Sequence, residues 1–299
     1  MILVYSVTAE ITAQWQRELQ KSRASTIMTD LSKTYGPWAI IAGGSEGIGL
    51  CFARQLAAAG INLVLLARRQ AALDDARATL AADYDVEVRV HSIDLTARDL
   101  EKELESIVAG LNIGLMIYNA GAMHGAELFV DGSLAKAQQL INLNCHGPAV
   151  FCHLLGKPMR DRGRGGIILM SSLSGLAGGA YVATYAATKS FDIVFAEALW
   201  AEMKPFGVDV LGLVAGATDT PSMARSGIDF NSGGFTPMRP EDVATEGLQQ
   251  LAHGPVHVAG DSNRAVADLL RADRVQAIEL LSSGAASMFN KPFPIASQE

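Results

Sequence analysis

Cysteine is scarce in this sequence, and the three residues that occur form no pattern. Cys51, Cys145 and Cys152 are odd in number and include no Cys-x-x-Cys pair. Such spacing indicates neither a disulfide framework nor a zinc site, so we expect no bound metal. Buried free thiols are the simplest interpretation, and they suit a reducing, cytoplasmic location.

Long apolar runs and clusters of positive charge are missing as well. No stretch approaches the ~20 apolar residues that a membrane helix needs, so no transmembrane segment is expected. The chain of 299 residues carries 24 Lys and Arg against 31 Asp and Glu, a formal net charge of −7. Without a basic patch, this balance argues against nucleic acid and acidic membranes as partners.

The first 27 residues differ in character from the rest. They open with the apolar run MILVYSV, which lacks a basic leader and a clear cleavage site. Ile11, Trp15 and Leu19 follow at helical spacing, which predicts a short amphipathic helix. It could pack on the domain or touch a membrane surface. Because Met28 opens a natural second start, residues 1–27 could also be an extension outside the fold.

What the chain does contain is a regular alternation of buried strands and helices. Its strands are short, continuous apolar runs, which are typical of a parallel sheet covered on both faces. The alternation predicts an α/β fold: a doubly wound Rossmann-type parallel sheet with helices on both faces, in a single domain over 28–275. A loop rich in Gly, Ser, Thr and Pro at about 216–238 is expected to cover the substrate, and 276–299 to form a C-terminal tail. The expected strands are 38–42, 62–66, 86–91, 114–118, 166–170, 208–213 and 256–259, and the expected helices are 47–59, 70–82, 97–109, 133–160, 183–204 and 240–252.

A glycine-rich turn follows the first expected strand. Residues 42–49 read AGGSEGIG, and such glycines bring backbone N–H groups close to a pyrophosphate at a helix N-terminus. No Lys-Ser/Thr follows, which argues against a nucleoside-triphosphate loop and leaves a plain tight turn as the alternative. After the second strand, Arg68 stands where an NAD site usually has Asp or Glu. We therefore expect Arg68, helped by Ser45, to bind the 2′-phosphate of NADP, unless Arg68 and Arg69 merely begin a solvated helix.

Tyr185 and Lys189 are four residues apart, on one face of an expected helix. An ordinary tyrosine has a pKa near ~10, and a neighbouring ammonium favours its phenolate and makes it a usable acid/base. Ser172 lies at the end of the GIILM strand, where its hydroxyl could hydrogen-bond a substrate carbonyl. Turn capping is the alternative role for this serine.

Together these motifs resemble the short-chain dehydrogenase/reductase family. The family's TGxxxGxG matches 42–49 with Ala42 in place of Thr, its NNAG matches 118–121 with Tyr118 in place of Asn, and its PG…T segment matches 215–220 with Ala215 in place of Pro. The resemblance covers about residues 36–260 and includes features similar to 3-oxoacyl and hydroxysteroid reductases. We expect Ala42 and Tyr118 to weaken the support of the nearby loops, and Ala215 to loosen the loop near the nicotinamide.

The resemblance implies hydride transfer between NADPH, preferred over NADH, and a ketone or secondary alcohol. Tyr185 would exchange the proton, Lys189 would favour the phenolate and hold the ribose, and Ser172 would orient the carbonyl. The implied catalytic residues are Asn144, which would position a water, with Ser172, Tyr185 and Lys189. The implied cofactor residues are Gly43, Ser45, Glu46, Gly47, Ile48, Gly49, Arg68, Asp94, Leu95, Asn119, Ala120, Gly121, Tyr185, Lys189, Gly216, Thr218 and Thr220.

Apolar residues around the expected loop favour a hydrophobic, lipid-like or steroid-like small-molecule substrate, although core packing is an alternative role for them. A non-catalytic NADP-binding regulator and an epimerase or dehydratase with the same Tyr–Lys pair are rival functions. The four catalytic positions argue against the first, and the GxxxGxG turn with a short region after the sheet argues against the second. By resemblance, the helices at 133–160 and 183–204 imply a homodimer or homotetramer. The candidate pocket residues are Met123, Leu176, Tyr181, Met223, Ile228, Phe230 and Phe235.

Overall fold

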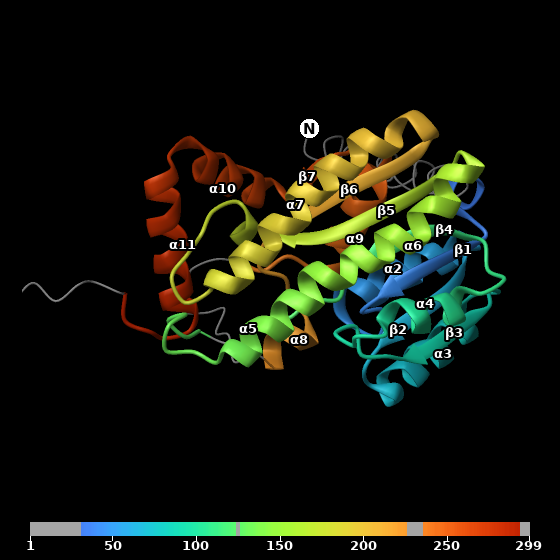
Figure 1. The fold of residues 1–299 in the computed structure, drawn as a ribbon, viewed down its shortest axis with the longest axis horizontal. Helices are drawn as coiled ribbons and strands as arrows, with labels where there is room; N and C mark the ends of the chain where they lie inside the picture. The colour runs from blue at the N-terminus through green and yellow to red at the C-terminus, as the bar shows by residue number, and fades with distance from the viewer. Residues whose placement is uncertain (1–30, 124–125, 226–235, 294–299) are drawn as a thin grey trace, which may run out of the picture.

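The computed structural model describes residues 31–123, 126–225 and 236–293, and Figure 1 shows their course. A sheet of seven parallel strands has the order β3-β2-β1-β4-β5-β6-β7. The chain runs outward from β1 to β3, returns to β4 beside β1, and then continues toward the other edge. The predicted doubly wound sheet is therefore confirmed. The strands are β1 Trp38–Ala42, β2 Asn62–Ala67, β3 Val88–Ser92, β4 Ile113–Tyr118, β5 Gly165–Ser172, β6 Val208–Ala215 and β7 Val256–Val258.

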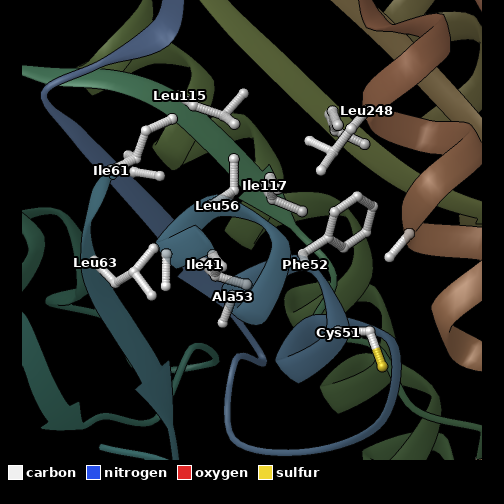
Figure 2. Close-up of a cluster of buried hydrophobic side chains, with 14 of the residues drawn as sticks. Ile41, Cys51, Phe52, Ala53, Leu56, Ile61, Leu63, Leu115, Ile117 and Leu248 are labelled. Atoms are coloured by element: carbon white, nitrogen blue, oxygen red, sulfur yellow. The ribbon is translucent and has the colours of Figure 1, made fainter. Parts of the chain in front are cut away.

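The central strands are apolar throughout because both of their faces are buried. In β1, Ala39 and Ile41 face one hydrophobic cluster, and Trp38 and Ile40 face another on the opposite side. Helices α2, α3 and α9 contribute to the first cluster, and α4, α6 and α7 to the second. Figure 2 shows the first cluster, in which Phe52 of α2 lies among strand side chains and helix residues.

The helix expected over 133–160 is interrupted. It consists of α5 (Leu134–Ile141), a π-helical turn at Asn142–His146, and α6 (Gly147–Arg162). Pro148 has no N–H and cannot donate to the carbonyl of Asn144, so a regular α-helical bond is impossible at this point. The remaining described α-helices are α2 Gly47–Ala58, α3 Gln70–Asp83, α4 Leu100–Val108, α7 Ala183–Met203, α8 Pro221–Arg225, α9 Pro240–Gln250, α10 Asp261–Ala272 and α11 Arg274–Met288.

The C-terminal part differs from the expected tail. The boundary expected at 275 falls inside α11, which is folded and packed over 276–288. Small residues of α11, including Ala277 and Ala285, let it approach the 173–182 segment closely. In Figure 1, α10 and α11 stand beside the sheet as a separate red pair. The tail expectation is therefore corrected, because small side chains with weak periodicity gave little signal for a packed helix.

The first described residues are already part of the fold. Residues 31–35 are helical, with Leu31 and Tyr35 buried, and the Tyr35 hydroxyl donates to Asp209 Oδ2 at 2.7 Å. The extension expected at 1–27 lies outside the described residues. Within the described ranges, no helix is long and apolar enough to cross a bilayer.

Candidate active site

The site forms where the carboxyl ends of β1, β4, β5 and β6 meet. The chain winds away from β1 and β4 in opposite directions, which opens a crevice between them at this edge. All of the sequence-predicted cofactor and catalytic residues are described, and they lie on or just after the ends of strands or on the helices that face them. No group of three His, Cys, Asp or Glu in the described part of the chain could hold a metal ion.

The glycine turn after β1 is closely packed against the segment after β4. Gly43 has φ +78°, and a Cβ atom there would lie 2.9 Å from Ala120 Cα. A Cβ atom on Gly49 would overlap the carbonyl oxygen of Gly43. Asn119 Nδ2 also donates to that carbonyl at 2.9 Å. The turn is therefore held in place despite Ala42, which corrects the expectation of weak support.

The N-terminus of α2 follows this turn, with Ser45, Gly47 and Ile48 around its start. Glu46 occupies the N-cap position but makes no side-chain cap hydrogen bond there. First-turn N–H groups without a cap are the usual ligands of a phosphate at a helix N-terminus. The crevice therefore has the glycines and the donors that a dinucleotide needs.

The Glu46 side chain instead joins two arginines. It pairs with Arg69 at 2.5 Å and with Arg225 of α8. Partial burial raises the pKa of Glu46, but the hydrogen bonds and charges of Arg225 and Arg69 outweigh it and leave that pKa below its usual value. Arg68 is exposed at the end of β2. The Glu46–Arg225 pair is not predictable from sequence, because no local spacing links residues so far apart.

The other expected cofactor residues line the same edge. Asp94 Oδ1 accepts hydrogen bonds from the Thr96 N–H and hydroxyl at 3.0 and 2.8 Å, and Leu95 is buried. Beyond β6, Thr218 is buried and donates to the Gly216 carbonyl at 3.1 Å. A Cβ atom on Gly47 would lie 3.2 Å from Thr220, so the segment after β6 lies directly over the glycine turn.

Tyr185 and Lys189 come together on α7, as their spacing predicts. Lys189 is buried, and its Nζ donates to the Met170 carbonyl at 2.7 Å and to Asp192 Oδ2 at 2.9 Å. Burial disfavours the ammonium, but the charge of Asp192, followed by that of Tyr185, raises the pKa of Lys189 above its usual value. A buried ammonium, paired with Asp192, therefore lies one helical turn from Tyr185.

Asn144 reaches the same point from the π-helical turn. Its Nδ2 donates to Thr188 Oγ1 at 3.0 Å, and that hydroxyl donates to the Tyr185 carbonyl at 2.9 Å. Asn144 Oδ1 is buried and has no hydrogen-bond partner among the described residues. A Cβ atom on Gly121 would lie 3.6 Å from this oxygen and 3.5 Å from Lys189 Nζ, so both polar groups face Gly121.

Tyr118 holds the π-helical turn against β4. Its hydroxyl donates to the Leu143 carbonyl at 2.7 Å, and its ring meets Phe151 edge-on at 5.2 Å. A Cβ atom on Gly147 would overlap this hydroxyl. Tyr118 therefore supports the element that carries Asn144, contrary to the expectation that it weakens its surroundings.

Ser172 ends β5, and its Oγ accepts a hydrogen bond from the Ser174 N–H at 3.2 Å. This is the capping arrangement that was the alternative for this residue. It leaves the hydroxyl hydrogen available to a substrate oxygen, so capping and carbonyl binding are compatible.

A cavity with both apolar and polar side chains in its lining opens beside Tyr185. Met123 and Tyr181 line it as expected, whereas Leu176 packs into the core instead. Ile228, Phe230 and Phe235 lie outside the described residues, and Met223 belongs to α8. The apolar lining is Met123, Leu128, Phe129, Ala137, Leu140, Val182 and Ala183, with the polar Glu127, Ser133, Lys136, Tyr181 and Thr184 around it.

Asp192 is a further site residue that was not predicted from sequence. It lies three residues after Lys189, so it shares the helix face of Lys189. The spacing was visible, but a carboxylate three residues from a lysine is common on solvated helices. Nothing in the sequence indicated that both side chains are buried.

Comparison with known proteins agrees with this geometry. The family model of the short chain dehydrogenases matches residues 37–229. The chain belongs to this family. It is 31% identical over 230 residues to a 7beta-hydroxysteroid dehydrogenase of Clostridium sardiniense, a match that covers 77% of this chain and 88% of that protein.

Further relatives of this family member include a reductase and two solved structures. It is 34% identical over 179 residues to a very-long-chain 3-oxoacyl-CoA reductase of Podospora anserina, which covers 58% of this chain and 53% of the reductase. A solved 7beta-hydroxysteroid dehydrogenase superposes with a TM-score of 0.77 at 26% identity, over 84% of this chain and 98% of the other. A short-chain dehydrogenase from Sphingobium yanoikuyae in complex with NADPH superposes with a TM-score of 0.72 at 28% identity. This superposition covers 81% of this chain and 95% of the other. The protein is an NAD(P)-dependent oxidoreductase that acts on alcohols and ketones.

Proposed function

We propose that this short-chain dehydrogenase prefers NADPH and reduces a hydrophobic ketone, with Tyr185 as its acid/base. One observation carries the proposal. The buried Lys189 ammonium lies one turn from Tyr185, and Tyr185 lines a cavity whose lining is partly apolar. The chemistry needs a proton donor that faces the substrate and a fixed positive charge that faces away from it.

The crevice fits a nicotinamide dinucleotide. The glycine turn, the uncapped start of α2 and the segment 119–121 would hold it, with Thr218 and Thr220 above. When bound, the cofactor supplies the hydride that reduces a carbonyl carbon, or accepts one from an alcohol.

The residues of this chain handle the proton and the carbonyl oxygen. In reduction, the Tyr185 hydroxyl gives its proton to that oxygen, and the Lys189 ammonium stabilises the phenolate that remains. The Ser172 hydroxyl donates a hydrogen bond to the same oxygen. Asn144 fixes the first turn of α7 through Thr188, and its buried Oδ1 suits a water that carries protons toward Lys189.

The preference for NADPH rests on charge at the end of β2. Arg68 is exposed there, and no acidic residue stands in its place to bind ribose hydroxyls. Arg69 is already paired with Glu46, which leaves Arg68 as the better candidate for the 2′-phosphate. The structural relative with bound NADPH supports this choice.

The apolar lining of the cavity supports a steroid-like or lipid-like substrate. The names of the two relatives, a 7beta-hydroxysteroid dehydrogenase and a very-long-chain 3-oxoacyl-CoA reductase, point to the same chemical class. This class includes rigid polycyclic ketones and ketones on flexible acyl chains, and the experiment below separates the two.

We also propose a cytoplasmic homodimer or homotetramer. Leu134 and Ile141 of α5 and Val194 of α7 are large apolar side chains left exposed in the single chain. The three cysteines are free, which suits a reducing compartment. Light scattering coupled to gel filtration measures the mass: a dimer or tetramer is expected, and a monomer would contradict the proposal.

The function is tested by following NADPH and NADH consumption with short diketones, 3-oxoacyl thioesters and ketosteroids. We expect turnover with NADPH that is fastest for one of the two large apolar classes. Faster turnover with NADH would refute the role of Arg68 but leave the chemistry intact. Tight NADPH binding without turnover of any ketone or alcohol would favour the regulatory alternative.

A further inference from the structure

Lys189 forms an ion pair with a buried acid, Asp192, that has no part in the proposed chemistry. The side chains of Lys189 and Asp192 are only 7% and 3% exposed, and their charged atoms are 2.9 Å apart. An ammonium has three N–H donors, and two of these are taken by Asp192 Oδ2 and the Met170 carbonyl. Both partners are fixed, one by β5 and one by α7, so the remaining donor has a defined direction.

Three other titratable groups around this pair, Tyr118, Cys145 and Cys152, carry no charge at neutral pH. Burial raises the pKa of Tyr118 and of Cys152 above their usual values. Burial, with the charge of Asp192, raises that of Cys145 to about 11. Asp192 is therefore the group that balances Lys189. The groups that face the pair are Tyr118 from β4, Cys145 from the π-helical turn, Cys152 from α6 and Tyr185 from α7.

We propose that Asp192 is a positioning residue for the reaction, which keeps Lys189 charged and aims its free N–H donor at the cofactor side. An isolated ammonium in this buried place would tend to lose its proton. A neutral Lys189 would no longer stabilise the Tyr185 phenolate. This inference rests on the proposed roles of Tyr185 and Lys189, but its main test needs no substrate.

The main test compares the stability of Asp192→Asn and the wild type in urea from neutral to alkaline pH. Without Asp192, burial alone acts on Lys189, so its proton is bound more weakly in the folded than in the unfolded chain. The folded variant then gains stability, relative to the wild type, as the pH rises toward 10.5, the usual value for lysine. We expect the loss of stability in Asp192→Asn, relative to the wild type, to be largest near neutral pH and to shrink with rising pH. A deficit that does not change with pH would overturn the proposal.

Asp209→Asn is the matched control. Asp209 also accepts a hydrogen bond from a buried side chain, that of Tyr35, at 2.7 Å. It lies near the start of β6, about 20 Å along that strand from the site. Its loss removes a carboxylate without leaving an ammonium unpaired. We expect that the difference in stability between Asp209→Asn and the wild type does not shrink as the pH rises. The same pH trend in both variants would count against a specific role for Asp192.

A second variant guards against failure to fold. Replacing both partners, with Lys189→Met and Asp192→Leu together, removes the charge and its counter-charge. We expect this double variant to be more stable at neutral pH than Asp192→Asn. Equal or lower stability would show that an unpaired ammonium is not the cause of the loss.

Enzyme assays then separate positioning from simple structural support. Tyr185 and Lys189 titrate as a pair, and Asp192→Asn removes a negative charge beside them. The pair therefore releases its first proton more easily, whichever of the two groups loses it. For Asp192→Asn, we expect the alkaline fall of kcat/KM in ketone reduction to move at least about one pH unit lower. Asp192→Glu should keep the wild-type position. An unmoved profile in Asp192→Asn would contradict the proposal, whereas the proposed function fails separately if Tyr185→Phe remains active.

Discussion

Two regions flank the candidate active site and are built in different ways: the glycine turn on the cofactor side, and α11 with the 173–182 segment on the substrate side. On the cofactor side, Gly43 and Gly49 lie so close to their neighbours that one added methyl group would clash with backbone. On the substrate side, α11 reaches the 173–182 segment through separate contacts, such as Ser282 Oγ to the Ala180 N–H at 2.9 Å. Large apolar side chains of α10 and α11 stay exposed, among them Leu269 at 62% and Val275 at 65%.

This difference indicates which of the two regions tolerates amino-acid substitutions. Backbone packing fixes the cofactor side, so almost any change there alters its geometry. Side-chain contacts hold the substrate side, and such contacts tolerate exchange better than close backbone packing does. We therefore expect the chemistry to depend on the first side and the choice of substrate on the second.

Tyr185→Phe should have the largest effect, because Tyr185 belongs to the chemistry and also borders the cavity. We expect ketone reduction to fall by about 100- to 10,000-fold, the usual contribution of a positioned acid, while NADPH still binds. Tyr181→Phe is the control, since Tyr181 lines the same cavity but donates to the Pro292 carbonyl. NADPH consumption and NADPH affinity are the measurements, and comparable losses of turnover in both variants would contradict the assignment.

Gly49→Ala tests the close packing of the cofactor side. The added methyl group would overlap the Gly43 carbonyl, so we expect a loss of about 1–3 kcal/mol in unfolding free energy, with weaker NADPH binding. Gly178→Ala on the substrate side is the control, because a Cβ atom there meets no other atom within 4 Å. Denaturant unfolding and cofactor titration check both, and a tolerated Gly49→Ala would refute the contrast between the sides.

Arg68→Ser should weaken NADPH binding by about 10-fold or more, the cost of losing a hydrogen bond to a charged group, and leave NADH binding unchanged. Arg69→Ser is the control, because Arg69 is occupied by Glu46. Titration with each cofactor distinguishes the two arginines. If Arg69→Ser lost more NADPH affinity than Arg68→Ser, Arg69 and not Arg68 would be the residue that binds the 2′-phosphate.

Replacement of Glu246, a residue of α9, has the smallest expected effect. The Glu246 side chain accepts hydrogen bonds from His257, the Gly260 N–H and Arg264, and so ties α9 to β7 and α10. Partial burial raises the pKa of Glu246, but these hydrogen bonds outweigh it and leave that pKa below 4.5. Its folded pKa is lowered, so its contribution to stability is present above pH 4.5 and is lost as the pH falls through the folded value.

Glu246→Gln should therefore melt at a lower temperature than the wild type at neutral pH, and the difference should shrink in acid. Thermal melts at several pH values measure it. Glu241, on the same helix, gives the matched control variant Glu241→Gln. A difference between Glu246→Gln and wild type that stays constant with pH would contradict the role given to this carboxylate.

Much of the cofactor side was predictable from sequence because its signals are local. The order of strands and helices, the glycine turn and the Tyr185–Lys189 spacing each depend on residues that are close in the chain. Asp192, the Tyr118 hydroxyl and the Glu46–Arg225 pair depend on burial or on contacts between distant segments. Helix α11 was missed for a related reason, because its small residues have meaning only against the 173–182 segment that they touch.

The contact between Tyr118 and Gly147 restricts how this protein can change. No side chain fits at 147 while the tyrosine hydroxyl occupies that space. In this packing the tyrosine at 118 requires glycine at 147, and a larger residue at 147 requires a smaller one at 118. The two positions are thus coupled by geometry. Libraries that vary 147 alone will return few folded variants, whereas libraries that vary both positions together can cross between the two arrangements.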